Sequence, residues 1–441
     1  MSVVTVQLGQ CGNQVGQQLL HSLLCDAQDG QRKELCTASR ERFFHQDTHG
    51  ELVARAVLID MEPKVINQSI SRAARSGMWR YGETSHFSQK QGSGNNWANG
   101  FCVHGPAHRE VVEELVRREV ERCDRLSGLL AMMVWQGGRA PESVPMLLSV
   151  SETSTLSPSS STTSPGRTGP ESVIVQNYNS VLTLAHLYQL SDAILVHEND
   201  TVHQICSQLL NIKHISFADV NSVIAHQLGS VLQPALTADS QGAYSRNPLG
   251  ELVSALCCHP EFKLLSVSSI PQVPLASMAY SSFSWPSLLK HLRQMLISNT
   301  KMEEGIDWQV RPPAAAERSK PHSRELQHVS GQRAHPRGKD VYSAETAGFE
   351  DPALYSSWLS PQEALSVGSP RCLLINMKKV PRWSVTARLC SAPWTAWWAE
   401  PGTCSPPEPT STSTLSLGSQ EDFLDSFSSL EQVISSYKEL R

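Results

Sequence analysis

Three short stretches of the chain combine glycine, amide and acidic residues in patterns that suit phosphate and metal binding. The first, after a short apolar alternation, is GQCGNQVG, from Gly9 to Gly16. Its glycines allow a tight turn, and the N-terminus of a following helix offers free amides and a positive dipole end to an anion. The second is IDMEP, where Asp60 and Glu62 supply hard carboxylate oxygens that suit Mg²⁺, usually through its waters. The third, residues 91–100, reads QGSGNNWANG and favours a nest of amide donors.

Each stretch also has an ordinary explanation when it is taken alone. The first fits a plain strand-to-helix turn, the acids fit solvated loop residues, and the third fits a surface turn. No G-x-x-x-x-G-K-[ST] motif occurs, and no G-x-G-x-x-G follows a strand, which weakens the case for a dinucleotide enzyme. No Ser/His/Asp or Cys/His set gathers at a recognisable spacing. The candidate site is therefore a set of strand-end loops, where ligands bind in open parallel sheets.

The elements that would position these loops alternate between strand and helix patterns. Strand patterns occur at residues 3–8, 54–59, 129–135, 173–175 and 193–196. Helix patterns occur from residue 14, at 108–126, at 179–190, from 202, at 219–231 and at 421–438. Asn199 or Asp200 is expected to cap the helix at 202, and Asp219 the next one. Such alternation predicts an α/β fold with a parallel sheet flanked by helices.

Three segments interrupt the pattern. Residues 149–170 are rich in Ser, Thr, Pro and Gly, and we expect them to form neither a helix nor a central strand. Residues 390–420 are similarly irregular despite their tryptophans. Residues 309–340 are polar and proline-rich, which is typical of a loop.

The bulk composition is that of a globular protein with two or three domains. The chain has 441 residues, of which 40% are hydrophobic, and 42 acids against 37 bases give a net charge of -5. No basic block favours nucleic acid, no signal peptide is visible, and the apolar run at 129–135 is too short to span a bilayer. The 11 cysteines lack C-x-x-C pairs, which predicts reduced thiols rather than disulfides or zinc.

The order and spacing of the three loops resemble the tubulin superfamily. QLGQCGNQVG, DMEP and GSGNNWANG look like its first three nucleotide loops. Other stretches are similar to the delta branch of that superfamily, among them HENDTVHQICSQLLNIKHISFADVN, HLRQMLISNTKMEEGID and EDFLDSFSSLEQVISSY. The likeness covers residues 1–128, 171–370 and 421–438.

The resemblance implies three regions and two bound groups. Residues 1–235 would form a Rossmann-like, parallel-sheet GTP-binding domain, interrupted by the irregular stretch at 149–170. Residues 236–370 would form an α+β intermediate domain, and residues 371–441 an incomplete, degenerate C-terminal helical region. GTP and Mg²⁺ would be the cofactors.

The resemblance also assigns roles to individual residues. Four residues are expected to contact the phosphates: Gln10, Cys11, Gly94 and Asn95. Gln10 and Cys11 would also contact the base. Those expected to hold the waters of Mg²⁺ are Glu62 and Asp60. Asn199 and Asn221 would hydrogen-bond the guanine edge, and Phe217 would stack on its face; taken alone, these three also fit a helix cap, a helix surface and a core aromatic.

Two further positions match the family pattern less directly: one has a different residue type, and the other would act on a neighbouring subunit. Gln176 stands where the family more often has an acid near the ribose. Glu251, in NPLGELV, matches the acid that alpha-tubulin offers to its neighbour's nucleotide, so it would position water for hydrolysis in the adjacent subunit. An ordinary surface glutamate explains Glu251 equally well.

The fourth family loop, G-G-T-G-S-G, is expected after Trp135, but the chain reads QGGRAPESVP there. Gly137 and Gly138 remain as phosphate-loop candidates, while Arg139 replaces the threonine. Pro141 falls where a backbone amide is wanted, and proline has no N–H. The arginine could still neutralise phosphate charge.

A second departure covers residues 370–420. Both departures start and stop abruptly, so we interpret them as a shifted reading frame, an exon-boundary error or an impaired variant. Resequencing the transcript would distinguish these explanations.

The resemblance implies a GTP-binding cytoskeletal protein of centrioles and basal bodies that supports triplet microtubules, cilia and flagella. It would be at most a slow, polymer-dependent GTPase, and its partners would be alpha-, beta- and epsilon-tubulin, microtubules and centriolar proteins. The expected location is the cytoplasm, cytoskeleton, centrosome, cilium base and nucleus, without nucleic acid or membrane partners. The alternatives are a scaffold of the same fold that no longer binds nucleotide, and a dinucleotide-dependent enzyme.

Overall fold

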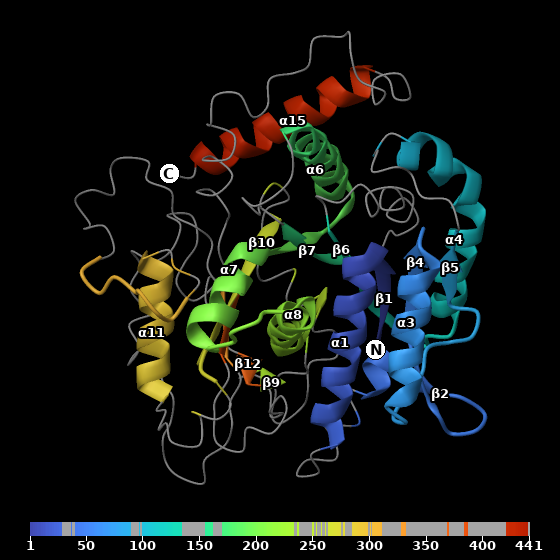
Figure 1. The fold of residues 1–441 in the computed structure, drawn as a ribbon, viewed down its shortest axis with the longest axis horizontal. Helices are drawn as coiled ribbons and strands as arrows, with labels where there is room; N and C mark the ends of the chain where they lie inside the picture. The colour runs from blue at the N-terminus through green and yellow to red at the C-terminus, as the bar shows by residue number, and fades with distance from the viewer. Residues whose placement is uncertain are drawn as a thin grey trace.

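A computed structural model describes most of the first half of the chain and scattered segments of the second. The described residues are 1–28, 37, 40–89, 97, 99–134, 155–161, 170–232, 236–237, 249–250, 253, 257, 261, 263–274, 277, 285–298, 300, 302–310, 328–331, 368–369, 383–386 and 420–439. Among these residues, nine strands form one sheet with helices on both sides (Figure 1). Its order is β11-β13-β10-β8-β7-β6-β1-β4-β5.

The strands and helices have the following bounds. The sheet comprises β1 (Ser2–Leu8), β4 (Ala56–Asp60), β5 (His86–Ser88), β6 (Leu126–Val134), β7 (Thr155–Ser161), β8 (Ala193–Glu198), β10 (Leu264–Ile270), β11 (His328–Gly331) and β13 (Trp383–Thr386). Short strands outside it are β2 (Phe44–Gln46), β3 (Leu52–Ala54), β9 (Leu236–Thr237) and β12 (Gly368–Ser369). The helices are α1 (Gly9–Gln28), α3 (Pro63–Arg75), η1 (Asn99–His104), α4 (Gly105–Glu121), α6 (Pro170–Leu190), α7 (Asn199–Gln204), η2 (Ile205–Leu209), α8 (Phe217–Leu232), α11 (Trp285–Ser298) and α15 (Gln420–Glu439).

Strand β1 lies in the interior of the parallel part of the sheet and is buried on both faces. It pairs in parallel with β4 on one side and β6 on the other. Because alternate side chains point to opposite faces, Val4 and Val6 pack in the core that includes residues of α4, α6 and α15, whereas Val3 packs in the core of α1, α3 and α8. Seven buried residues in a row are the consequence.

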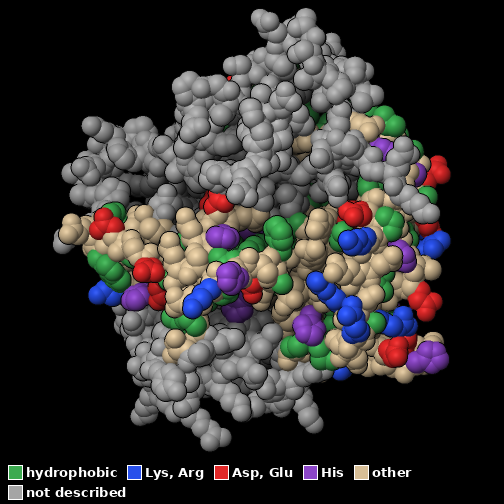
Figure 2. Space-filling view, in the orientation of Figure 1, with side chains coloured by type: hydrophobic (Ala, Val, Ile, Leu, Met, Phe, Trp, Pro, Cys, Tyr) green, Lys and Arg blue, Asp and Glu red, His purple; other side chains and the backbone are tan. Residues whose placement is uncertain are grey.

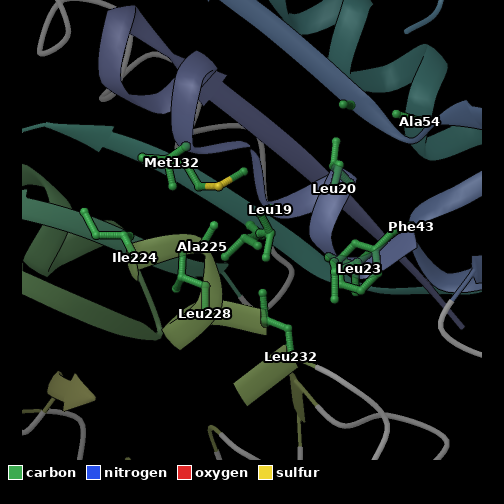
Figure 3. Packing of buried hydrophobic residues seen from close by; sticks show 14 of the residues in the cluster. Leu19, Leu20, Leu23, Phe43, Ala54, Met132, Ile224, Ala225, Leu228 and Leu232 are labelled. Carbon is green, nitrogen blue, oxygen red and sulfur yellow. The ribbon is translucent and has the colours of Figure 1, made fainter. Parts of the chain in front are cut away.

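The second core is built mainly from helices α1 and α8. Leu19 of α1 lies beside Ala225 of α8, whereas Leu23 lies against Phe43 and Leu20 is on the side of Ala54 (Figure 3). All of these side chains are almost completely buried. The apolar stripe expected in the helix from residue 14 is therefore confirmed, and it fixes α1 between the sheet and α8.

Several predicted elements are confirmed with small changes of boundary. The patterns at 3–8, 129–135 and 193–196 correspond to β1, β6 and β8, and the one at 421–438 to α15. The pattern at 54–59 is divided between β3 and β4. The helix expected at 108–126 is α4, but it ends at Glu121, since Leu126 instead begins β6 and pairs with Ser2.

Other expectations are wrong. Residues 173–175 form no strand, because they lie inside the helix α6, whose first residue Pro170 suits a helical first turn. The irregular stretch at 149–170 contains β7, which fills the position between β6 and β8. Pairing with β6 and β8 therefore determines the strand conformation of β7, although its Ser-rich composition does not favour a strand and Pro158 has no backbone N–H to donate. Residues 328–331, within the segment expected to be a loop, form β11 and pair with β13. The described residues do not include 390–419.

The expected helix caps are also displaced. Glu198 precedes α7 as its N-cap, so that neither Asn199 nor Asp200 has this role. At α8, the Ser216 backbone N–H donates to the Asp219 carboxylate (2.9 Å), and the Asp219 N–H donates to the Ser216 hydroxyl (3.4 Å). This is a reciprocal capping box with Ser216 as the cap.

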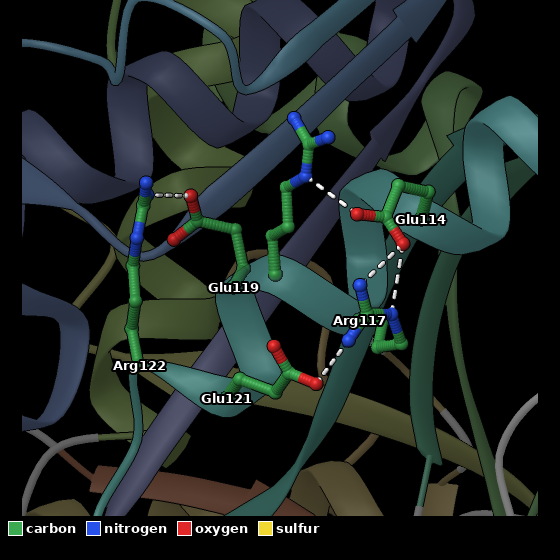
Figure 4. A network of polar contacts seen from close by, with 6 residues as sticks. Glu114, Arg117, Glu119, Glu121 and Arg122 are labelled. Atoms are coloured by element: carbon green, nitrogen blue, oxygen red, sulfur yellow. Dashed lines mark hydrogen bonds and ion pairs between the residues drawn. The ribbon is translucent and has the colours of Figure 1, made fainter.

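Charges on the described surface are mixed. Acidic and basic side chains are interspersed on the face shown in Figure 2. On α4, Glu114 forms ion pairs with Arg117 and Arg118, while the Glu119–Arg122 pair lies on another side of the helix (Figure 4). Among the described helices, none is long and apolar enough to cross a bilayer.

Glu119 generates a pH-dependent prediction. It is 2% exposed, and burial raises the pKa of its carboxyl group, although Arg122 (2.5 Å) and Arg55 oppose the shift. The folded state then holds this proton more tightly than the unfolded state, so stability is lost as the pH rises above about 4.5. We expect Glu119→Gln to remove this loss, so that its advantage in unfolding free energy over the wild type grows from pH 4.5 towards neutrality. Urea unfolding across that range measures it, with the exposed Glu121→Gln as the control; a pH-independent difference contradicts it.

Gly12 generates a packing prediction. A Cβ atom at this position would lie 2.0 Å from the carbonyl oxygen of Met132 in β6, so α1 fits against the sheet only with glycine there. We expect Gly12→Ala to lower the free energy of unfolding by about 3 kcal/mol. Gly50→Ala is the control, because Gly50 has a φ of +82° but open space around it, and it should cost only about 1 kcal/mol. Chemical denaturation compares the two, and equal losses would refute the close-packing argument.

Candidate nucleotide-binding site

Parallel pairing brings the ends of several strands to one edge of the sheet. Strands β4, β1, β6, β7 and β8 are parallel neighbours, so their carboxyl ends lie at the same edge. Leu8 of β1 is in register with Ile59 of β4. The loops after Leu8 and Asp60 are therefore adjacent, as the hypothesis of a shared site requires.

The first loop is very short, because α1 begins at Gly9, directly after β1 ends at Leu8. Gly9 has a φ of +66°, a left-handed conformation that glycine adopts without strain. Gln10 is exposed and Cys11 is half-buried at the start of the helix. The first amides of a 20-residue helix therefore point to the edge where the strands end, and this arrangement suits an anion.

The second loop places two carboxylates beside the first. Asp60 ends β4, is 3% exposed and accepts the backbone N–H of Glu62 through Oδ1 (3.1 Å). Glu62 is half-buried and precedes α3, and its side chain makes no capping hydrogen bond. The buried Asp60 thus shapes the turn, while Glu62 is the more accessible oxygen donor.

These donors fit a magnesium ion that binds mainly through other ligands. Carboxylate oxygens are the correct ligand type, and Mg²⁺ commonly combines one or two carboxylates with phosphate and water. Among the described residues, no group of three or more His, Cys, Asp or Glu side chains could hold a metal ion. Glu62 and Asp60 are the two carboxylates at this edge that could hold the waters of such an ion.

Asn13 joins the two loops, and sequence reasoning missed it. Its side chain is completely buried, and its Nδ2 donates to the carbonyl oxygens of Gly9 (2.8 Å) and Ile59 (3.3 Å). Asparagine is unfavourable inside a helix unless its side chain is bonded locally. The available signal was an asparagine directly after Gly12, near the start of a predicted helix.

The residues expected at the base lie on α7 and α8. Asn199 is half-buried and begins α7 immediately after β8, and α7 contacts α8. Asn221 on α8 donates through Nδ2 to Oε1 of Gln14 on α1 (3.2 Å), which places it beside the first turns of α1. Gln14 is a second residue that sequence reasoning missed.

Phe217 is the most exposed large apolar side chain described, at 80%. It is the first residue of α8, directly after the Ser216 cap. Hydrogen bonds from the Ser216 hydroxyl and N–H lower the pKa of Asp219, so the capping carboxylate stays ionised at neutral pH. The capping box thus fixes the backbone that presents Phe217, whose free ring face could stack on a base.

Several predicted site residues lie outside the described residues. They are Gly94, Asn95, Gly137, Gly138 and Glu251, and the altered positions Arg139 and Pro141. Gln176 lies in α6, but its side chain is not described. Within the third loop, the N–H of the buried Trp97 donates to Asn179 Oδ1 (3.2 Å), so α6 holds this residue.

Comparisons with known proteins show which family the chain belongs to. Residues 2–207 match the Tubulin/FtsZ family, GTPase domain. The chain is 48% identical over 453 residues to the tubulin delta chain of Macaca fascicularis, covering 99% of both chains. It is 48% identical over 458 residues to that of Mus musculus, covering 100% of both, and 47% identical over 457 residues to that of Homo sapiens, covering 99% of both. With a parallel sheet flanked by helices, and with similarity over the full length, the chain belongs to the tubulin family and is a homologue of tubulin delta chains.

Proposed function

We propose that the chain is a GTP-binding cytoskeletal protein that acts at centrioles and basal bodies, where it supports triplet microtubules and the assembly of cilia and flagella. The observation that carries the nucleotide part is the junction of the Gly9 and Asp60 loops at one sheet edge, tied by Asn13. The full-length similarity to tubulin delta chains supports the cellular part. We retain the division into a GTP-binding domain (1–235), an intermediate domain (236–370) and a C-terminal region (371–441) as part of this proposal.

The chain's own residues suit each part of the nucleotide. Amides at the start of α1, with Gln10 and Cys11, would bind phosphate oxygens, and residues 94–95 would extend this cradle. Glu62 and Asp60 would orient the waters of Mg²⁺. When bound, Mg²⁺ would supply the positive charge that offsets the phosphates.

At the other end, Asn199 and Asn221 would hydrogen-bond the guanine edge while Phe217 covers its face. Both asparagines present amide groups that can donate and accept, as the guanine edge requires. The Gln14 contact restrains Asn221 before any ligand binds, which reduces the ordering cost of binding.

Hydrolysis is proposed to depend on a neighbouring subunit. Glu251 would position water at the nucleotide of the next tubulin, so the site would be complete only in a polymer. The proposed neighbours are alpha-, beta- and epsilon-tubulin, in microtubules and among centriolar proteins. Such an arrangement makes the chain at most a slow, polymer-dependent GTPase.

A second candidate is a scaffold of the same fold that binds no nucleotide. The sequence QGGRAPESVP after Trp135 favours it, because Arg139 and Pro141 stand in the fourth loop. Proline cannot donate an amide hydrogen bond there. The two candidates differ in whether the purified chain carries guanine nucleotide.

Nucleotide content and the role of Phe217 can be tested together. We expect denatured, purified protein to release guanine nucleotide, and Phe217→Ala to weaken GTP binding by roughly tenfold to a hundredfold, the usual worth of base stacking. Trp308→Ala is the control, because Trp308 is an exposed aromatic residue (49%) on another segment. Chromatography of the released nucleotide and titration calorimetry measure both. Protein without guanine nucleotide, and without affinity for added GTP, would leave only the scaffold; bound NAD would instead revive the dinucleotide enzyme.

Restoring the fourth loop tests the cost of its alteration. The quadruple change Arg139→Thr, Ala140→Gly, Pro141→Ser and Glu142→Gly recreates G-G-T-G-S-G. Each regained charge-assisted hydrogen bond is worth about 1.5–3 kcal/mol, so GTP affinity should rise roughly tenfold to a hundredfold. Equal affinities before and after restoration would show that Arg139 or another group already replaces the lost donors.

The proposed action at centrioles can be tested separately in cells. A tagged chain expressed in ciliated cells should concentrate at centrioles, and its depletion should remove triplet microtubules. A uniform cytoplasmic distribution with intact triplets would contradict the proposed site of action.

A further inference from the structure

Asn13 forms a link that the β-ladder cannot supply. The pairing of β1 with β4 ends at Leu8 and Ile59. Beyond this point β1 turns into α1, so no ladder hydrogen bond holds Gly9 beside Asp60. The side chain of Asn13 reaches back four residues to the Gly9 carbonyl (2.8 Å) and across 46 residues of sequence to the Ile59 carbonyl (3.3 Å).

The chemistry of the link requires an amide. The side-chain amide nitrogen of asparagine has two N–H donors, so one group can serve two carbonyl acceptors. Alanine would remove both bonds, and aspartate would place a carboxylate against two carbonyl oxygens. Of the small side chains, asparagine therefore suits this position specifically.

Helix packing alone does not account for the residue. Asparagine is less favourable than alanine inside a helix, and burial of its amide has a further cost. Its Oδ1 is buried and has no hydrogen-bond partner among the described residues. A residue that served only to pack α1 on the sheet would be apolar, so the two donated bonds are what this site requires.

We propose that Asn13 is a positioning residue that couples the phosphate side of the site to its magnesium side. It fixes the Gly9 carbonyl, and so the first turn of α1, relative to the residue before Asp60. Phosphate contacts from α1 and magnesium-water contacts from Glu62 are thereby held in one geometry. This inference rests on the proposed function for the identity of the ligand, but not for the coupling between the two loops.

The coupling can be measured without ligand. In Asn13→Ala, hydrogen–deuterium exchange should rise about tenfold in both 9–12 and 60–62, since both loops lose the shared bond. Tyr81→Phe is the matched control, because it also removes a buried hydrogen bond to β1, from Tyr81 Oη to Gln7 Oε1 (3.1 Å), but leaves both bonds of Asn13 to the Gly9 and Ile59 carbonyls in place. It should leave both segments unchanged.

The ligand readout compares GTP affinity in Mg²⁺ with GTP affinity in EDTA. In the wild type Mg²⁺ should raise affinity strongly, whereas in Asn13→Ala and Asn13→Asp that gain should fall about tenfold. A loss of stability alone would lower affinity equally in both buffers, as expected for Tyr81→Phe.

The outcomes separate the two proposals. An unchanged Mg²⁺ gain together with unchanged exchange in Asn13→Ala overturns the coupling and leaves GTP binding intact. A wild type that binds no GTP overturns the proposed function, and the exchange experiment then decides the coupling by itself. Exchange that rises in only one of the two segments also overturns it.

Discussion

The parallel pairing of β1 with β4 and β6 is the constraint on which the candidate site depends. It sets Leu8 beside Ile59 and Gln7 beside Met132. Because both faces of β1 are covered by helices, a shift of register by one residue would move its apolar side chains to the wrong core. The same register that buries the strand therefore also places the Gly9 turn next to Asp60.

Close packing of α1 on the sheet also fixes the position of α1 relative to α8, which carries Asn221. Gly12 leaves room for the Met132 carbonyl, and a Cβ on Gly16 would lie 2.4 Å from the side chain of Gln7. Leu19 of α1 lies beside Ala225 of α8 (Figure 3). Earlier in the same helix, Gln14 accepts a hydrogen bond from Asn221 (3.2 Å). The residues proposed to contact the phosphates and those proposed to contact the base are therefore connected through α1.

Sequence patterns predicted those strands and helices whose buried residues form a regular apolar pattern within the element itself. β1, β6, β8, α1 and α15 follow from their own apolar periodicity, and the motif order identified the family. β7 could not be predicted from a Ser- and Pro-rich segment, because its strand conformation depends on β6 and β8. The helix caps are local, but they lie at Glu198 and Ser216, one and three residues before the positions that the sequence suggested. Asn13 depends on a contact with Ile59, 46 residues away, which the local sequence pattern does not reveal. Gly94, Gly137 and Glu251 stay predictions, because they lie outside the described residues.

The central claim is that glycine-rich and acidic turns at neighbouring strand ends hold one guanosine triphosphate. An experimental structure of the full chain with a non-hydrolysable GTP analogue and Mg²⁺ tests it most directly. We expect the phosphates at the start of α1, the metal's waters at Glu62 and the base between Phe217 and Asn221. A nucleotide bound elsewhere, or Gly9–Gly12 and Asp60–Glu62 lining different cavities, would contradict it.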